Sequence, residues 1–316
     1  MVTGIYLVLA LLAGYAVYRS LDLDVPLDSL LEVRAKPPSQ FLEVEGQSVH
    51  YRDQGARDAP VILLLHGTSA SLHTFEGWAE KLQENWRVIS VDLPGFGLTG
   101  PWIGALESQD YSRENYAIFL FQFMDKLKIK RFAVAGNSLG GEVAWQMAAS
   151  SKERVSAQIL LNAAGYADTG GQYPLAWKLI TWPITSSISM SMLPRSAVAQ
   201  GLRQVMVDQN LVTPDKIELY RDLGLRAGNR KALQQRLRFI TADGGVQHLP
   251  QIEIPTLIIW GEQDVLIPSS TAKRFLKDIR GSELVIFDDL GHIPQEENPE
   301  RTVAVAIDFL RKTNSA

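Results

Sequence analysis

The chain has 316 residues and no cysteine, which excludes disulfide bonds, thiolate metal ligands and cysteine nucleophiles. Only five histidines are present, and they are scattered without the paired spacing of a zinc site. No Gly-x-Gly-x-x-Gly pattern follows a strand-like segment, since Gly95-Phe96-Gly97 lacks the third glycine. We therefore expect no metal and no other cofactor.

Runs of basic residues are also missing. The 31 Lys and Arg residues are outnumbered by 35 Asp and Glu residues, for a formal net charge of −4. Nucleic acid is therefore not an expected partner. With 46% hydrophobic and 21% charged residues, the composition is that of a globular protein with one large domain, with or without an insertion.

One long apolar run stands at the N-terminus. Residues 1–18 contain no charged side chain, and a helix of this length would span about 27 Å, close to the roughly 30 Å of a hydrocarbon core. We expect an uncleaved, single-pass N-terminal membrane anchor. The alternatives are a buried core helix and export with a cleaved signal peptide, but no basic residue precedes Ile5 and residues 15–18 make a poor cleavage site.

Basic residues follow this run and none precedes it. Arg19, Arg34 and Lys36 favour a cytoplasmic location for the rest of the chain by the positive-inside rule. Residues 19–40, which include Pro37-Pro38, are expected to form a tether.

Strand-like and helix-like segments alternate from residue 41 onward. Strand patterns cover 41–51 (a hairpin around Glu45-Gly46), 61–65, 88–91, 131–135, 155–161, 255–260 and 283–287. Helix patterns cover 72–85, 113–127, 142–149, 269–279 and 299–311, while residues 165–250 hold helical stretches and no strand pattern. This order predicts an α/β fold with a mostly parallel central sheet flanked by helices. The core would comprise residues 41–164 and 251–316, with a helical cap over 165–250.

The stretch Gly136-Asn137-Ser138-Leu139-Gly140 joins one of these strands to the next helix. A strand, a G-x-S-x-G turn and a helix form a nucleophile elbow. The turn is so tight that side chains two positions either side of the serine would collide, so glycine is needed there. The pattern predicts that Ser138 is a nucleophile, whereas a serine in an ordinary glycine-rich turn is the alternative.

A serine hydroxyl needs a base, and the base needs a carboxylate that holds its tautomer. Asp264 and His292 each follow a predicted strand, at the edge of the sheet where Ser138 lies. Glu262 is the alternative acid, and Asp288 or Asp289 is too close to His292 in sequence. Structural roles are expected for the other histidines, with His50 on the surface: His50, His66, His73 and His248.

This order of elements and motifs resembles the α/β-hydrolase fold superfamily of serine hydrolases. The resemblance implies a catalytic triad of Ser138, Asp264 and His292. It also implies an oxyanion hole made by the N–H groups of Leu139 and Thr68, with Gly67 as the alternative to Thr68. In some relatives the acid follows the strand that here ends at residue 161, where this chain has an asparagine that cannot serve as an anion.

The residue at the elbow discriminates between reactions. Similar haloalkane dehalogenases and epoxide hydrolases carry aspartate there, so Ser138 indicates esters, thioesters or amides and an acyl-enzyme. Candidates for an apolar substrate pocket in the cap are Trp177, Trp182, Met190 and Met192, unless they only form the core of the cap. An anchor with an apolar cap resembles membrane-bound monoacylglycerol-lipase-like hydrolases, which implies a carboxylic ester hydrolase for apolar or lipid-derived small-molecule esters.

Two further interpretations remain open. The Gly-Asn-Ser-Leu-Gly-Gly stretch also resembles the C–C bond hydrolases of aromatic ring-cleavage pathways, although those typically carry tryptophan after the catalytic histidine and Ile293 stands here. A non-catalytic binding protein of α/β-hydrolase fold is the other. Such proteins often lose a member of the triad, and this chain keeps all three candidate residues.

Overall fold

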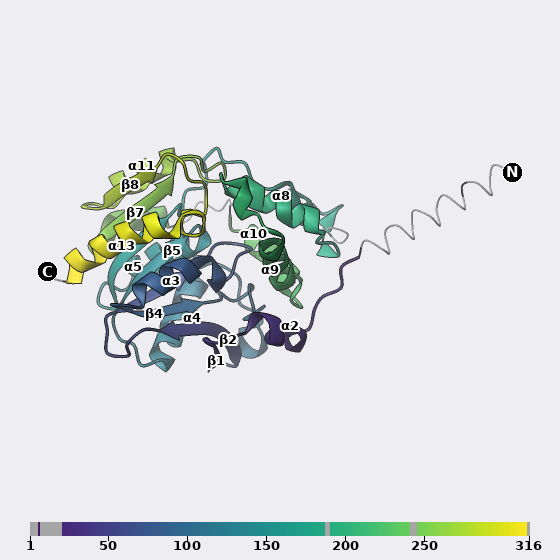
Figure 1. The fold of residues 1–316 in the computed structure, drawn as a ribbon, viewed down its shortest axis with the longest axis horizontal. Coiled ribbons are helices and arrows are strands. Elements are labelled where there is room, and N and C mark those ends of the chain that lie inside the picture. The colour runs from purple at the N-terminus through teal and green to yellow at the C-terminus, as the bar shows by residue number, and fades with distance from the viewer. Residues whose placement is uncertain (1–5, 7–20, 187–189, 241–244, 315–316) are drawn as a thin grey trace.

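One eight-stranded sheet forms the centre of the molecule (Figure 1). The computed structural model describes residues 6, 21–186, 190–240 and 245–314. The strands are β1 (Ser39–Val44), β2 (Gln47–Gln54), β3 (Val61–Leu65), β4 (Arg87–Val91), β5 (Phe132–Asn137), β6 (Val155–Leu161), β7 (Thr256–Gly261) and β8 (Glu283–Phe287). They lie in the order β1-β2-β4-β3-β5-β6-β7-β8, and all pairs from β4 to β8 are parallel.

The two antiparallel pairs lie at one edge of the sheet. β1 pairs with β2, and β2 pairs with β4. Between β1 and β2 the chain turns at Glu45 and Gly46, both with positive φ (50° and 82°), as the commonest two-residue hairpin requires. The predicted hairpin and the predicted mostly parallel α/β sheet are confirmed.

Helices cover both faces of the sheet because its central strands are apolar on both sides. The helices of the core are α3 (Glu76–Leu82), α4 (Arg113–Lys126), α5 (Leu139–Ser150), α11 (Ser270–Asp278), α12 (Pro294–Glu297) and α13 (Pro299–Asn314). Leu63 and Leu65 of β3 pack in the cluster that contains residues of α4, α5 and α11. The alternating residues Ile62 and Leu64 pack in the cluster that contains residues of α3 and α13.

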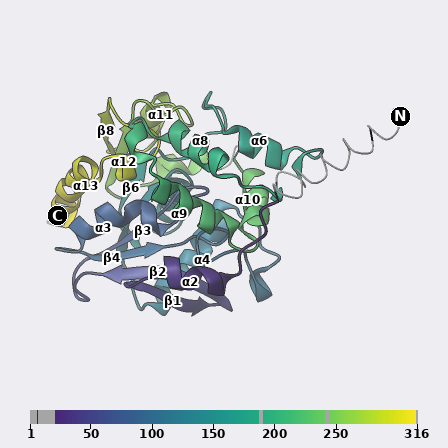
Figure 2. The ribbon, with the colours of Figure 1, turned by 45° about the vertical axis from the view of Figure 1, so that its right-hand side comes forward.

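Between β6 and β7 the described residues form helices and no strand. These helices are α6 (Leu175–Thr181), α8 (Arg195–Val205), α9 (Pro214–Leu225) and α10 (Asn229–Leu237), with short 3₁₀ turns at Gln209–Leu211 and Val246–Gln251. They gather at one end of the sheet (Figures 1 and 2). The start of α9 follows ordinary capping rules: Thr213 accepts the N–H of Lys216, and Pro214 occupies the first turn.

The segment expected to be a tether is instead docked on these helices. Residues 21–36, which we call the N-terminal segment, contain the helix α2 (Leu27–Arg34). Backbone hydrogen bonds join Val25 to Leu225 (2.8 Å) and Ala227 to Val25 (2.8 Å). Three ion pairs add to them: Asp22–Arg221, Asp24–Arg230 (2.6 Å) and Arg34–Asp222 (2.7 Å). Acidic and basic side chains of the N-terminal segment therefore pair with opposite charges on α9 and α10.

The predicted membrane location is not supported. No helix among residues 6, 21–186, 190–240 and 245–314 is both long enough and apolar enough to cross a membrane. Of the predicted anchor, residues 1–18, only Tyr6 belongs to the described residues. The expected single-pass anchor is therefore not supported. The cytoplasmic orientation inferred from Arg19, Arg34 and Lys36 depended on that anchor and is not supported either.

The docked N-terminal segment yields a stability prediction. The double substitution Asp22→Asn with Asp24→Asn removes two partly exposed ion pairs, each worth about 0.2–1 kcal/mol. Urea denaturation should show a fall in the free energy of unfolding of about 0.5–2 kcal/mol, smaller at high salt because salt screens such pairs. Asp28→Asn is the matched control, since exposed Asp28 of the same segment forms no ion pair with a described residue. An equal loss in the control variant would contradict this account.

Candidate active site

Ser138 lies in a strained turn between β5 and α5. Its backbone has φ 53° and ψ −113°, a conformation that residues other than glycine rarely adopt. A Cβ atom on Gly136 would lie 2.1 Å from the carbonyl oxygen of Gly140, and one on Gly140 would lie 2.0 Å from the carbonyl oxygen of Leu65. The two glycines are therefore required by backbone contacts, as the sequence predicts for a nucleophile elbow.

Free N–H groups surround the serine. Leu139 is the first residue of α5, so its N–H has no partner within that helix. The loop after β3 packs against Ser138, since a Cβ on Gly67 would lie 3.2 Å from the Cβ of the serine. Within the described part of the chain, neither the N–H of Thr68 nor that of Leu139 donates a hydrogen bond. This arrangement can bind a negatively charged oxygen.

His292 is hydrogen-bonded to a buried carboxylate. Its Nδ1 lies 2.7 Å from Oδ2 of Asp264, and both residues are buried. The other carboxylate oxygen, Oδ1, accepts the N–H groups of Leu266 (2.8 Å) and Ile267 (3.0 Å). Asp264 is thus fixed by its own loop in an orientation that holds the imidazole with Nδ1 as donor.

Two asparagines hold this pair in place, and sequence reasoning had given neither of them a role. Asn162, directly after β6, donates to Oδ2 of Asp264 (2.7 Å) and accepts the N–H of Gly261 (3.2 Å). Asn137 donates to the carbonyl oxygen of His292 (2.9 Å). The sequence signal that could have identified these asparagines is their position at the ends of β5 and β6, which are neighbours in the sheet.

Ser138 and His292 line the same pocket, and no hydrogen bond joins them among the described residues. Catalytic hydrogen bonds are often long before substrate binds, so the lack of a hydrogen bond between these two residues is compatible with a base and a nucleophile. The alternative acids lie elsewhere: Glu262 is exposed, and Asp289 pairs with Arg301.

The expectation that His50 lies on the surface is wrong. His50 is fully buried, and its Nδ1 lies 2.7 Å from the buried carboxylate of Asp92. Burial alone would raise the pKa of Asp92, but its contacts with His50 and the neighbouring His66 and His73 hold that pKa below its usual range. The outer hairpin misled the prediction, because β2 pairs with β4 and only β1 forms the edge.

His66 has a structural role, as expected, because it shapes the loop before Thr68. Its Nδ1 lies 2.7 Å from the carbonyl oxygen of Gly67, and its Nε2 accepts the N–H of Leu93 (2.9 Å). Burial lowers the pKa of His66, which keeps the ring neutral in this position.

A cavity of about 600 Å³ opens beside Ser138 under the helices that follow β6. Most of its wall is apolar, and about half of its lining residues come from α6, α8 and the residues between them. Of the pocket candidates, Trp177 and Met192 line it. Trp182 is 56% exposed, and neither it nor Met190 is among the lining residues.

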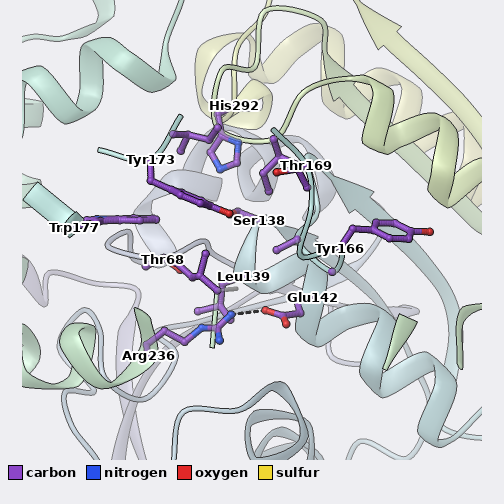
Figure 3. Close-up of a pocket in the computed structure, with 15 residues that line it drawn as sticks. Thr68, Ser138, Leu139, Glu142, Tyr166, Thr169, Tyr173, Trp177, Arg236 and His292 are labelled. Carbon is purple, nitrogen blue, oxygen red and sulfur yellow. Dashed lines mark hydrogen bonds and ion pairs between the residues drawn. The ribbon is translucent and has the colours of Figure 1, made fainter. Parts of the chain in front are cut away.

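A second, smaller pocket of about 40 Å³ shares Ser138, Thr68 and His292 with the large cavity. Figure 3 shows this pocket with His292 on one side and the joined side chains of Arg236 and Glu142 on the other. The serine therefore lies where an apolar cavity meets a smaller pocket whose lining is more polar than that of the cavity.

Comparisons with known proteins show the family of the chain. A model of the Alpha/beta hydrolase family matches residues 62–305. An uncharacterized hydrolase of Bacillus subtilis, YugF, is 25% identical over 279 residues, which are 88% of this chain and 100% of that protein. A 2-hydroxy-6-oxononadienedioate/2-hydroxy-6-oxononatrienedioate hydrolase of Escherichia coli O139:H28 is 29% identical over 294 residues, covering 87% of this chain and 96% of the relative.

Among solved structures, a membrane phospholipase A described as a bacterial virulence factor is similar over 100% of this chain and 99% of its own, with a TM-score of 0.74 and 25% identity. The match to the family model covers most of the chain, including the elbow and the segments that carry Asp264 and His292. The chain therefore belongs to the alpha/beta hydrolase family and is a hydrolase.

Proposed function

We propose that this protein is a serine hydrolase that cleaves carboxylic esters with apolar or lipid-derived acyl groups. The observation that carries the proposal is the position of Ser138 at the wall of an apolar cavity of about 600 Å³, beside the hydrogen-bonded pair of His292 and Asp264. That volume lies within the roughly 300–1,000 Å³ typical of small-molecule sites. Residues 165–250 serve as the cap that supplies most of the apolar wall.

In the first half of the reaction, Ser138 Oγ attacks the ester carbonyl carbon while His292 takes its proton. The negative charge on the carbonyl oxygen is stabilised by the N–H groups of Leu139 and Thr68 and by the N-terminus of α5. The bond to the alcohol oxygen then breaks, and His292 returns the proton to that oxygen. Asp264 stays ionised and stabilises the imidazolium.

In the second half, water attacks the acyl-enzyme. His292 takes a proton from the water, and the resulting hydroxyl adds to the acyl carbon. The bond to Ser138 breaks, the proton returns to Oγ, and the carboxylic acid leaves. No metal or redox partner is needed for either half.

The similarity to a phospholipase A supports a lipid-derived ester, because that structure matches this chain over its full length. The similarity to the Escherichia coli hydrolase supports a second candidate, hydrolysis of a C–C bond in a vinylogous diketone. Two features favour the ester. Ile293, in place of the tryptophan typical of the C–C hydrolases, packs with Leu202 and Met206. Asn137 belongs to the stretch that resembles the C–C hydrolases, but its side-chain amide already donates to the backbone carbonyl oxygens of Leu161 and His292.

Covalent labelling tests whether the site is catalytic at all. A fluorophosphonate probe should label the wild-type protein and leave Ser138→Ala unlabelled, because only an activated hydroxyl attacks phosphorus at a useful rate. Intact mass spectrometry measures the adduct, and circular dichroism confirms that both proteins are folded. A folded wild type that takes no label would favour a binding protein instead.

The size of the cavity predicts a preference for longer acyl chains. With p-nitrophenyl esters, kcat/KM should rise up to about fourfold per methylene from acetyl to octanoyl, since each buried methylene is worth about 0.8 kcal/mol. Gly201 on α8 lines the cavity, and a Cβ there would meet nothing within 4 Å. Gly201→Leu should therefore lower octanoyl turnover and leave acetyl turnover unchanged, with Gly201→Ala as the control.

A chain-length profile that is flat in all three proteins would contradict the assignment of the cavity to the acyl chain. Absence of turnover on every ester, together with hydrolysis of a vinylogous diketone, would instead establish the C–C reaction.

Asn162 is predicted to act by positioning Asp264. In Asn162→Ala, Oδ2 of Asp264 keeps only the imidazole as a side-chain donor, so kcat should fall about tenfold or more, with KM little changed. The acid limb of the kcat/KM profile should move to higher pH. The Asp264 carboxylate no longer shares its negative charge with the Asn162 amide and therefore stabilises the imidazolium more strongly.

The matched control is Gln158→Ala on β6, the strand that precedes Asn162, where the side chain bonds to Thr256 away from the site. It should lower stability without moving the pH profile. A profile that stays in place in Asn162→Ala would reduce the asparagine to a structural role.

A further inference from the structure

The loop that carries His292 is attached by its backbone to the end of α8. The N–H of His292 donates to the carbonyl oxygen of Val205 (2.9 Å), which is the last residue of that helix. A Cβ on Gly291 would lie 2.5 Å from the same oxygen, so this close approach requires glycine. The imidazole ring is therefore held by a carboxylate, whereas the backbone that carries the ring is held by α8.

Glu297 connects the same two segments a second time. It is the last residue of α12 and is only 9% exposed. Its Oε2 accepts the N–H of Gly291 (2.9 Å), the residue before His292. Its Oε1 accepts the N–H groups of Val207 (2.7 Å) and Asp208 (2.9 Å), which follow α8 in the chain. A buried carboxylate needs such donors, and because they come from both segments it fixes the distance between them.

The end of α8 that Glu297 holds is also part of the wall of the large cavity. Gly201, Leu202 and Val205 of this helix line the cavity. Ile293, the residue after the histidine, lines it too and packs with Leu202. One helix thus borders the space proposed for the acyl chain and holds the backbone of the proposed base.

We infer that Glu297 is a positioning residue, which sets the place of His292 by tying the backbone before the histidine to the end of α8. The inference rests on the proposed serine hydrolysis, in which His292 is the base. Proton transfer from Ser138 depends on the distance to the imidazole, and a misplacement of about 1 Å can cost about 100-fold in rate. Glu297 is not among the residues that line either pocket, so it acts through the histidine.

The substitution Glu297→Gln tests this role, since it keeps the size of the side chain. Its single amide oxygen can accept from only one of the two segments, and its NH₂ group faces N–H donors on the other side. With p-nitrophenyl octanoate, kcat should fall about 10–100-fold, the range of a lost hydrogen bond to a charged group. KM should change less than about threefold, because substrate contacts remain. Glu297→Asp keeps the charge and should retain part of kcat.

Asp208 allows the α8 side of the bridge to be weakened without a change at Glu297. The φ of Asp208 is −76°, close to the fixed φ of proline, so Asp208→Pro removes one N–H and keeps the backbone angle. Asp208→Ala is the matched control, because it removes the same exposed side chain and keeps the N–H. The kcat of the proline variant should be about 3–10-fold below that of the alanine variant. Equal kcat values in these two folded variants would overturn the inference.

Glu296→Gln is the control on α12 itself. The side chain of Glu296 bonds to Lys216 and Tyr220 of α9, so it also joins α12 to the helices that follow β6. These contacts do not involve the backbone beside His292. The variant should lose stability and keep kcat within about threefold of wild type. A fall in kcat as large as that of Glu297→Gln would show that any contact between α12 and those helices has this effect, and would contradict a specific role for Glu297.

A proton resonance distinguishes positioning from a loss of stability. The Nδ1–H of His292, hydrogen-bonded to Asp264, should give a low-field NMR signal in wild type that is absent in Asp264→Ala. The signal should shift or broaden in Glu297→Gln and Asp208→Pro, because the ring moves relative to the carboxylate. It should stay in place in Asp208→Ala and Glu296→Gln.

This resonance needs no substrate, so it separates the inference from the proposed function. If wild type hydrolyses no ester but the signal changes in Glu297→Gln and Asp208→Pro alone, the reaction assignment fails and the positioning role stands. If esters are hydrolysed and both variants keep the kcat and the signal of their controls, the positioning role fails alone.

Discussion

The backbone strain at Ser138 is the constraint on which the site depends. A residue with a side chain is held at φ 53° where α5 approaches β5 and the end of β3 so closely that only glycine fits at positions 136 and 140. The same close approach sets the start of α5 directly after the serine, where the N–H of Leu139 has no partner among the described residues. It also brings the loop after β3 against the turn. The parallel sheet supplies the rigidity that keeps this conformation from relaxing.

Parallel strand order then brings together residues that are distant in sequence. β5, β6, β7 and β8 are neighbours in the sheet, so the loops at their carboxyl ends meet. Ser138, Asn162, Asp264 and His292 follow these four strands in turn. The asparagine between serine and aspartate is part of the same logic, because its strand lies between theirs. The helices after β6 complete the site from above with an apolar cavity on one side and the Arg236 wall on the other.

Much of this architecture could be predicted from the sequence. Strand and helix periodicity, the G-x-S-x-G turn and the strand-end positions of Asp264 and His292 are local signals, and the core strands and helices lie within a few residues of their predicted limits. What could not be predicted depends on contacts between distant segments. His50 is buried because its strand, β2, lies between β1 and β4, and it bonds to a carboxylate 42 residues away. The N-terminal segment docks through charges on α9 and α10, which no local pattern reveals.

The ion pair of Arg236 and Glu142 beside the small pocket also depends on a contact between distant segments, so the sequence did not predict it. Arg236 and Glu142 are 94 residues apart, and each alone reads as an ordinary solvent-facing side chain on a helix. The apolar run at residues 1–18 shows the opposite failure, in which a strong local signal supported an anchor that the described structure does not support. Hydropathy alone carried that prediction.

The central claim is that Ser138 carries the acyl group during turnover. Rapid-quench mass spectrometry with p-nitrophenyl octanoate tests it most directly. The account predicts a burst of p-nitrophenolate that matches the enzyme concentration, and an octanoyl group on the peptide that contains Ser138. Steady turnover with no acyl group on that peptide, or equal turnover by Ser138→Ala, would contradict it.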